Sequence, residues 1–404
     1  MTKIRPAFVL VGLLALSGCG AAAAPRPVAP APTEAAPVKT TEVPETVISP
    51  YTDDELVKQF EHGRELVLAG KIEEAAKVFD KLTRLAPKTL IGASSLYNAG
   101  MCHEDLGEHD VAIERYTALV TQFPEHQSAR PARFRAMHLL GYVERWPELL
   151  TMADSVLKLT DLTVIEKIDA LGARALGNVE QDKLDEADKD VMRARDIIED
   201  NHLGESGKPP MELMQVSFAL GEVRRLKSEK IGFDPLPPNF PVVLEARCQA
   251  LLDAQAAYTD AMRGYDAHWS AMSGYRIGQL YQKLHAEVMA IPPTAAAKTL
   301  KQKQLFEATM RLRYRILLEK GLKMMDGTVR LGERTGETSG WVSRARDAKK
   351  DLEQALADEK AALSKMPFSE DEVKEAMEKL KQKASAQPAA TSQSGTTPPS
   401  GATP

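Results

Sequence analysis

The sequence predicts an all-α fold in which antiparallel helix pairs stack into a solenoid. Aromatic residues make up only 5% of the 404 residues, whereas Ala, Leu, Glu and Lys recur throughout, which favours helix over sheet. Two consecutive windows also share one spacing of small and large residues over 34 positions. A hydrophobic fraction of 43% is sufficient for an ordered core.

Composition excludes several classes of protein. The net charge of −5 argues against nucleic acid as the main partner, because phosphate binding needs a clustered basic excess. Three cysteines cannot form a disulfide framework. A disulfide-rich miniprotein, a collagen and a multi-span membrane protein are therefore excluded.

The first residues have the order of a bacterial export signal. Lys3 and Arg5 precede an apolar stretch from Ala7 to Leu16, whose 10 residues are too few to span a bilayer. Small residues then lead directly to Cys19. The alternative is a signal peptide with an incidental cysteine.

The motif Leu16-Ser17-Gly18-Cys19 resembles a bacterial lipobox. This resemblance implies that residues 1–18 are a lipoprotein signal peptide and that Cys19 carries covalent lipid such as palmitate. Gly20 stands where many lipoproteins retained at the inner membrane have aspartate. The resemblance therefore implies a lipid-anchored protein of the outer membrane that faces the periplasm.

Both ends of the mature chain have the composition of unfolded segments. Residues 19–50 join Cys19 to a Pro/Ala-rich stretch that favours an extended linker. Residues 387–404 are rich in Ser, Thr, Pro, Gly and Ala and are expected to be a disordered tail. Neither segment carries catalytic residues.

The first folded helix has a clear start signal. Thr52 and Glu55 form a T-x-x-E capping box, and Tyr51 with Leu56 forms the matching hydrophobic staple. Ser369 with Glu372 repeats the capping box before the last predicted helix. Order is therefore expected from residue 51.

Residues 56–89 and 93–126 resemble tetratricopeptide repeats (TPR), which fold as helix pairs. Gly or Ala lets the two helices approach closely, a large residue fills the gap and Pro ends the unit. The positions of this pattern are Gly63, Gly70, Ala75, Phe79, Leu82 and Pro87, then Gly100, Gly107, Ala112, Tyr116, Leu119 and Pro124. A TPR solenoid is predicted over 51–232, with degenerate pairs after residue 130.

Further segments complete the predicted array. Residues 233–241 are a Pro-rich loop, and 242–366 form a degenerate TPR-like helical domain. Within it, Asp266 is an N-cap candidate between two helices, and long helices follow from Leu300 to Arg334 and from Trp341 to Lys365. Residues 367–386 are expected to be a C-terminal capping helix.

A broader resemblance concerns the biological setting. The stretch Tyr275-Arg276-Ile277-Gly278-x-x-Tyr281, the Pro292-Pro293 break and Trp341 are similar to TPR lipoproteins of deltaproteobacteria and myxobacteria. Some of those proteins belong to envelope-spanning machines, gliding motility among them. The resemblance implies a cell-envelope context and no particular activity.

No catalytic or metal-binding motif stands out. The chain has no H-E-x-x-H, G-x-S-x-G or C-x-x-C motif. Cys102, His103, Glu104, Asp105 and His109 are close in sequence, but adjacent helical residues diverge by about 100° and cannot all reach one ion. We therefore expect no enzyme activity, no metal and no cofactor besides the lipid, although a peptidoglycan-cleaving enzyme is a possible class for a helical solenoid.

Cys102 is expected to be a buried thiol, and whether it pairs with Cys248 stays open. A second feature is a basic strip in the helix expected from Leu300, where Arg311 and Arg315 share a face. The strip is either a solvated face or a docking site for an acidic partner, lipid headgroups or peptidoglycan carboxylates.

The binding surface expected of such repeats is the concave groove lined by the first helix of each pair. Fitting the 34-residue spacing assigns these positions to the partner-binding groove: Phe60, Arg64, Val67, Tyr97, Met101, Glu104, Arg135, Leu139 and Tyr142. Aromatic residues and arginine are enriched in binding hot spots.

The sequence thus predicts a membrane-anchored periplasmic adaptor for protein–protein interactions in an envelope complex, with motility machinery as one setting. The partners expected are proteins of that complex and the outer membrane, with no nucleic acid and no small-molecule substrate. Alternatives are a β-barrel assembly factor, a pilus or secretin pilotin, and a peptidoglycan-binding structural tether.

Overall fold

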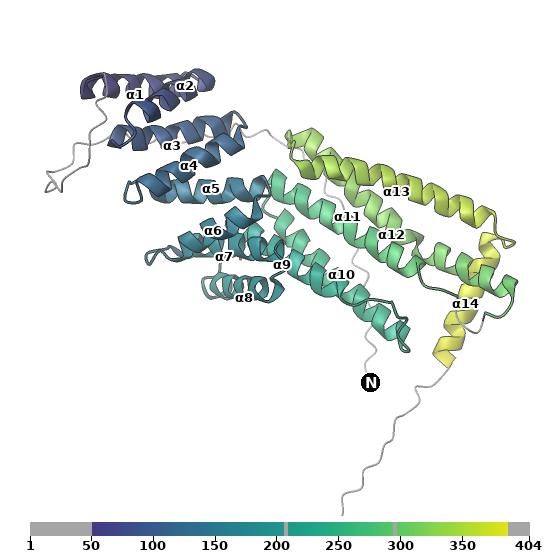
Figure 1. The fold of residues 1–404 in the computed structure, drawn as a ribbon. Coiled ribbons are helices and arrows are strands. Elements are labelled where there is room, and N and C mark those ends of the chain that lie inside the picture. Colours follow the sequence, from purple (N-terminus) through teal and green to yellow (C-terminus); the bar gives the residue numbers. More distant parts are fainter. Residues whose placement is uncertain (1–50, 206–208, 294–296, 387–404) are drawn as a thin grey trace, which may run out of the picture. The chain divides into compact units, whose positions relative to one another are not determined.

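The computed structural model describes residues 51–205, 209–293 and 297–386, and every regular element in these ranges is an α-helix. The all-α prediction is confirmed (Figure 1). The expected signal peptide, Cys19, the linker to residue 50 and the tail from 387 lie outside the described residues. Among the described helices, none is both long and apolar enough to cross a membrane.

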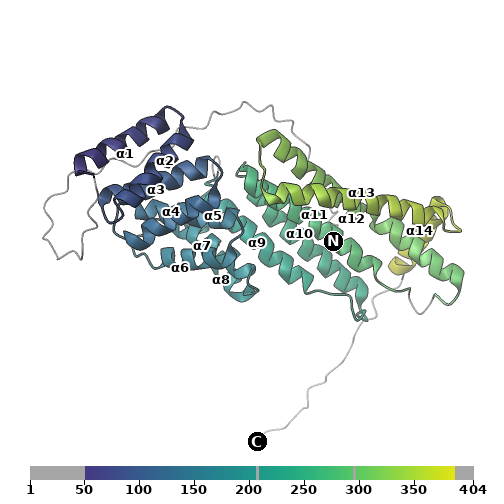
Figure 2. The ribbon, with the colours of Figure 1, turned by 45° about the horizontal axis from the view of Figure 1, so that its top comes forward.

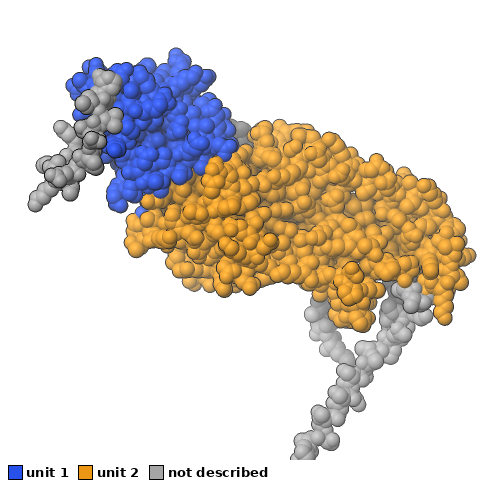
Figure 3. All heavy atoms as spheres, in the orientation of Figure 1, with its two compact units in different colours: residues 1–132 blue, residues 133–404 orange. Residues whose placement is uncertain are grey.

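The chain forms two compact units, residues 1–132 and 133–404, which are coloured separately in Figure 3. Within the first unit, α2 packs on both α1 and α3, α4 packs on α3, and α1 also touches α3. This is the contact pattern of stacked helix pairs. Its helices are α1 (Asp53–Leu68), α2 (Ile72–Leu85), α3 (Leu90–Asp105) and α4 (His109–Gln122), and α5 (Ala129–Tyr142) starts within it.

Two glycines let the helices of the first unit approach as the repeat pattern predicts. A Cβ atom at Gly63 would lie 2.8 Å from the Phe79 ring, and one at Gly100 would lie 2.5 Å from the Tyr116 ring. Real Cβ atoms do not approach that closely, so only glycine fits without movement of the ring. Phe79 and Tyr116 are fully buried.

The second unit continues the stacking with longer helices. From α6 to α13 each helix packs on the next, and α7, α9, α11 and α13 also touch in turn, as the first helices of successive pairs do in a solenoid. Figure 2 shows α10 to α13 side by side. The helices are α6 (Trp146–Leu157), α7 (Val164–Val179), α8 (Leu184–Asp200), α9 (Glu212–Glu229), α10 (Phe240–Met262), α11 (Ala267–Met289), α12 (Leu300–Thr335), α13 (Gly340–Ser364) and α14 (Glu370–Ala386).

The local signals that mark helix starts are confirmed. Thr52 and Glu55 form the reciprocal capping box, and Ser369 and Glu372 form the second one. Asp266 caps α11 by accepting a hydrogen bond from the Trp269 N–H at 2.9 Å. The contact pattern divides the chain after residue 132. The sequence instead predicts a boundary between the two helical parts at the Pro-rich loop 233–241.

Candidate functional site

One exposed face of α1 combines apolar and charged side chains. Val57, Glu61, Arg64 and Leu68 are three or four residues apart, so they share one side of the helix. Val57 is 41% and Leu68 is 80% exposed, and Arg64 forms an ion pair with Glu61 at 3.0 Å. We call these four residues the α1 face. It contains one residue of the predicted groove, Arg64.

Three other predicted groove residues are buried instead. Phe60 is 1% exposed and packs edge-on against Phe79, with ring centroids 5.5 Å apart. Tyr97 packs against Tyr116 at 5.9 Å, and Met101 is buried on the same helix. Every residue from Ile91 to His103 is buried because neighbouring helices cover α3 on most sides. These three side chains therefore belong to the core and cannot line an open groove.

The remaining predicted groove positions are partly or fully buried. Glu104 accepts a hydrogen bond from the Tyr116 hydroxyl at 2.9 Å, so its carboxylate fixes the ring that fills the helix gap. Val67 packs on the core, Leu139 is buried and Arg135 is half-buried on α5. The first two repeats therefore do not present a continuous groove lined by all of the predicted residues.

Tyr142, at the end of α5, belongs to a polar cluster of the second unit. Its ring lies against His268 with centroids 4.4 Å apart, and its hydroxyl donates to Glu337 Oε1 at 3.4 Å. His268, with its Nδ1 3.7 Å from Glu337 Oε1, lowers the pKa of Glu337 to about 2, against the opposing effect of burial. Burial and the Glu337 charge raise the pKa of Tyr142 to about 12. The cluster joins α5, α11 and the turn before α13.

The polar side chains around Cys102 contact one another. His103 Nε2 lies 3.0 Å from Asp80 Oδ2, its Nδ1 lies 2.5 Å from Glu108 Oε2, and Arg115 donates to Asp80 at 2.8 Å. Cys102 is buried, and burial together with Asp105 and Asp80 raises the pKa of its thiol to about 12. Cys102 and Cys248 are both free thiols. Within the described ranges, no three His, Cys, Asp or Glu side chains are placed to hold a metal ion.

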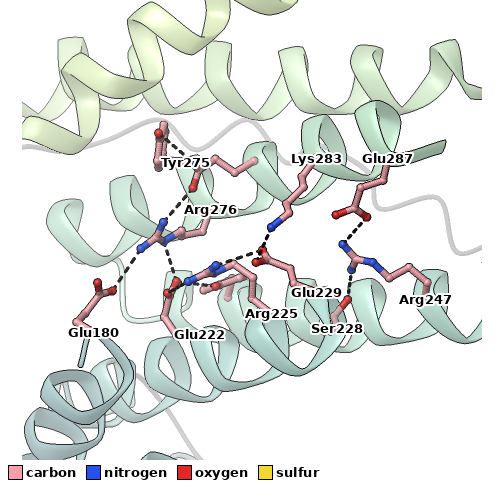
Figure 4. A network of polar contacts seen from close by, with 12 residues as sticks. Glu180, Glu222, Arg225, Ser228, Glu229, Arg247, Tyr275, Arg276, Lys283 and Glu287 are labelled. Carbon is pink, nitrogen blue, oxygen red and sulfur yellow. Dashed lines mark hydrogen bonds and ion pairs between the residues drawn. The ribbon is translucent and has the colours of Figure 1, made fainter. Parts of the chain in front are cut away.

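A network of charged residues connects α7, α9, α10 and α11 (Figure 4). Its centre is Glu222, which is fully buried. Arg225 donates to Glu222 at 2.7 Å, the Tyr258 hydroxyl donates to it at 2.6 Å, and Arg276 Nε lies 2.8 Å from it. Burial alone would raise the pKa of Glu222, but the charges of Arg276 and Arg225 lower it below its ordinary value.

The network extends to both sides of this centre. Arg276 also reaches Glu180, the C-cap of α7, at 3.4 Å, and Arg225 also reaches Glu229 at 3.1 Å. Lys283 donates to Glu229 at 2.8 Å. Next to this series of ion pairs, the fully buried Arg247 donates to Ser228 and, at 3.1 Å, to Glu287. Such a set of paired charges fixes the packing of the four helices, and each charge in it already has a partner within the network.

Residues that carry the resemblance to envelope lipoproteins pack together in the second unit. The rings of Tyr275 and Trp341 pack edge-on with centroids 5.6 Å apart, and the Arg276 guanidinium lies 5.0 Å from the Trp341 ring. Trp341 therefore stacks the start of α13 on α11. These residues have a packing role in addition to the resemblance that they carry.

The two arginines of the basic strip already have acidic partners. Arg311 forms ion pairs with Glu307 and Glu359, both at 2.8 Å. Arg315 lies 3.3 Å from Glu319 and 3.9 Å from Glu370. Because these carboxylates offset both positive charges, the pair is poorly suited to attract an acidic polymer.

Cavities lie between helices in the described part of the second unit. One of about 400 Å³ lies between α8, α9 and α10 and is lined by three arginines and by apolar residues that include Leu213 and Met214. Its arginines are balanced by Glu199, Glu205 and Asp260 in the same lining. Another cavity lies between α12, α13 and α14.

Sequence reasoning did not find the Glu222 network or the His268–Glu337 pair. A weak signal for Glu222 is its position directly after Gly221, a small residue of the kind that lets the helices of the predicted repeats approach closely. No local signal exists for Glu337, which lies 195 positions from its partner Tyr142.

Comparison with known proteins identifies one segment directly. Residues 94–126 match the family model described as tetratricopeptide repeat. No curated protein sequence matches the chain.

Similar solved structures include a tetratricopeptide repeat protein from Parabacteroides merdae, with 12% identity, a TM-score of 0.39, and coverage of 74% of this chain and 99% of that chain. A TPR repeats protein from Bacteroides fragilis has 11% identity, a TM-score of 0.28, and coverage of 74% and 98%. The TPR2AB domain of yeast Sti1, in a complex with pHSP90, has 13% identity, a TM-score of 0.24, and coverage of 76% and 100%. Residues 94–126 thus form a tetratricopeptide repeat within an all-helical array of stacked helix pairs.

Proposed function

We propose that this protein is a non-catalytic scaffold that binds other proteins through its helix-pair array. The observation that carries the proposal is the tetratricopeptide repeat at 94–126, stacked on a first helix whose α1 face exposes Leu68 and Val57. Protein contact surfaces combine apolar side chains with arginine, and the α1 face has both. The charged network inside the second unit would keep that part of the scaffold rigid.

We further propose that Cys19 is lipidated and that the scaffold serves an envelope complex from the periplasmic face of the outer membrane. The support is the order of charged, apolar and lipobox residues in the sequence. Attachment to a membrane would raise the local concentration of scaffold and partner, so that modest affinity suffices. Motility machinery is the setting that the sequence resemblance favours, and a β-barrel assembly factor or a pilotin is the alternative.

A scaffold is preferred to a peptidoglycan tether for one reason. The tether needs free positive charge on the basic strip, but Arg311 and Arg315 each have carboxylates within ion-pair distance. The α1 face, in contrast, has side chains that the fold leaves exposed.

Site-specific photo-cross-linking in cells tests the contact surface. A photoreactive amino acid replaces Leu68, and the control places it at Lys88, which is exposed on the loop after α2. We expect a discrete covalent adduct with another protein from position 68 and none from position 88. No adduct from position 68, or the same adducts from both positions, contradicts a protein contact at the α1 face.

Membrane fractionation tests the anchor separately. We expect the wild-type chain in the outer-membrane fraction and the Cys19→Ser chain in the soluble periplasmic fraction. Outer-membrane localisation that persists in the Cys19→Ser chain refutes the anchor and leaves the protein contact open.

A further inference from the structure

We propose that the cavity between α12, α13 and α14 binds a medium-chain alkyl carboxylate, with its chain inside the cavity and its carboxylate at Lys360. The site lies where α14 packs beside α12 near the end of α13 (Figure 1). It goes beyond the scaffold function, which involves no small molecule.

The size of the cavity sets the length of the ligand. Its volume is about 380 Å³, within the range of about 300–1,000 Å³ that is usual for small-molecule sites. At about 30 Å³ for each water-sized atom, it holds about a dozen non-hydrogen atoms. A ten-carbon carboxylate, decanoate, has that size.

The inner wall is apolar and comes from all three helices and the α13–α14 turn. Ala308 and Leu312 belong to α12, Leu363 to α13, Phe368 to the turn and Val373 to α14. Ala308 and Val373 are buried, and the other three are partly buried. An alkyl chain that enters this space is removed from contact with water. This burial strengthens binding about fourfold for each methylene.

The charged residues of the lining favour an anion over a cation or a neutral molecule. Arg315 and Lys360 line the cavity together with a single carboxylate, Glu370. Arg315 lies 3.3 Å from Glu319 and 3.9 Å from Glu370, so its charge is already offset, and Lys374 forms an ion pair with Glu370 at 3.2 Å. Among the residues that the structure describes, no carboxylate forms an ion pair with Lys360. A third cation is near, since Lys301 lies 5.8 Å from the centre of the Phe368 ring.

The site is tested by calorimetric titration with decanoate below its micelle concentration. The protein used starts at residue 19 and carries Cys19→Ser, so it has no lipid and needs no detergent. We expect one saturable site. Lys360→Gln weakens decanoate binding about fivefold, the effect of one partly exposed ion pair. The matched control Lys350→Gln, an exposed lysine on the same helix, leaves binding unchanged.

Chain length and charge are then varied. Octanoate, which is two methylenes shorter, is expected to bind roughly sixteenfold more weakly than decanoate. Decan-1-ol is expected to bind wild type and Lys360→Gln equally. The Leu312→Trp variant, which fills the cavity, abolishes decanoate binding, whereas Leu300→Trp at the exposed start of α12 does not.

Four results would each overturn the proposal. They are no saturable binding of decanoate, equal losses in Lys350→Gln and Lys360→Gln, octanoate affinity equal to that of decanoate, and full binding by a folded Leu312→Trp chain. Because Lys360 is exposed, its variant is expected to fold, and circular dichroism checks this for each variant.

Discussion

Replacing Glu222 by glutamine tests whether the buried charged network stabilises the second unit. The substitution keeps the size of the side chain and removes one negative charge from a fully buried position. Arg225 at 2.7 Å and Arg276 at 2.8 Å lose their shared anionic partner. An uncompensated buried charge is costly, because water cannot reach it.

The expected magnitude follows from what each arginine retains. Breaking a buried ion pair costs about 3–5 kcal/mol. Arg225 keeps Glu229 at 3.1 Å and Arg276 keeps Glu180 at 3.4 Å, while the glutamine oxygen still accepts the Tyr258 hydrogen bond. We therefore expect the lower end, a loss of about 3 kcal/mol in the free energy of unfolding.

Urea unfolding followed by circular dichroism measures this loss. With a slope of about 3 kcal/mol/M, the midpoint falls by about 1 M. The control Asp347→Asn removes a carboxylate from an exposed pair, 3.2 Å from Lys350, and is expected to change the free energy by less than about 0.5 kcal/mol. A Glu222→Gln midpoint within the error of Asp347→Asn would refute the reasoning.

The pH dependence supplies a second check on the same residue. Because the native pKa of Glu222 lies below its ordinary value of 4.5, its contribution is complete above that pH and is lost as the pH falls through the native pKa. The stability difference between wild type and Glu222→Gln should therefore shrink in acid. A difference that grows in acid contradicts the assigned direction.

Three further predictions follow from the described contacts. Gly100→Ala places a Cβ atom 2.5 Å from the Tyr116 ring and should lower the free energy of unfolding by about 1–3 kcal/mol in thermal denaturation; no change would contradict the close approach. Glu337→Gln should destabilise the protein less at pH 2 than at pH 7, because the native pKa of Glu337 is about 2 against an ordinary value of 4.5; equal effects at both pH values would disprove this. In native protein with Cys19→Ser, iodoacetamide should modify half-buried Cys248 before Cys102, because the thiol pKa of Cys102, about 12, suppresses the reactive thiolate. Mass spectrometry that finds Cys102 modified first would rule this out.

Local features of the fold could be predicted from the sequence because their causes are local. The capping box at Thr52 and the N-cap at Asp266 depend on residues within one turn of a helix. The pairing of Gly63 with Phe79 and of Gly100 with Tyr116 repeats a known spacing, so it was predictable as well.

The exposure of the groove residues could not be predicted in the same way. The helix pattern shows which side of α3 holds Tyr97 and Met101, but not that neighbouring helices cover that side. The Glu222 network joins residues from four helices, and α7 and α11 are nearly 100 residues apart. Such contacts depend on the tertiary arrangement, which residue spacing alone does not specify.

Cross-linking followed by affinity purification from membranes tests the central claim, that this protein is a scaffold for protein partners, most directly. Wild type is compared with a variant that carries Arg64→Glu and Leu68→Asp on the α1 face, and with the control Lys88→Glu. Mass spectrometry should find defined envelope proteins with wild type and Lys88→Glu that are absent from the double variant. Capture of the same proteins by all three chains, or of none by wild type, would contradict a scaffold that acts through this face.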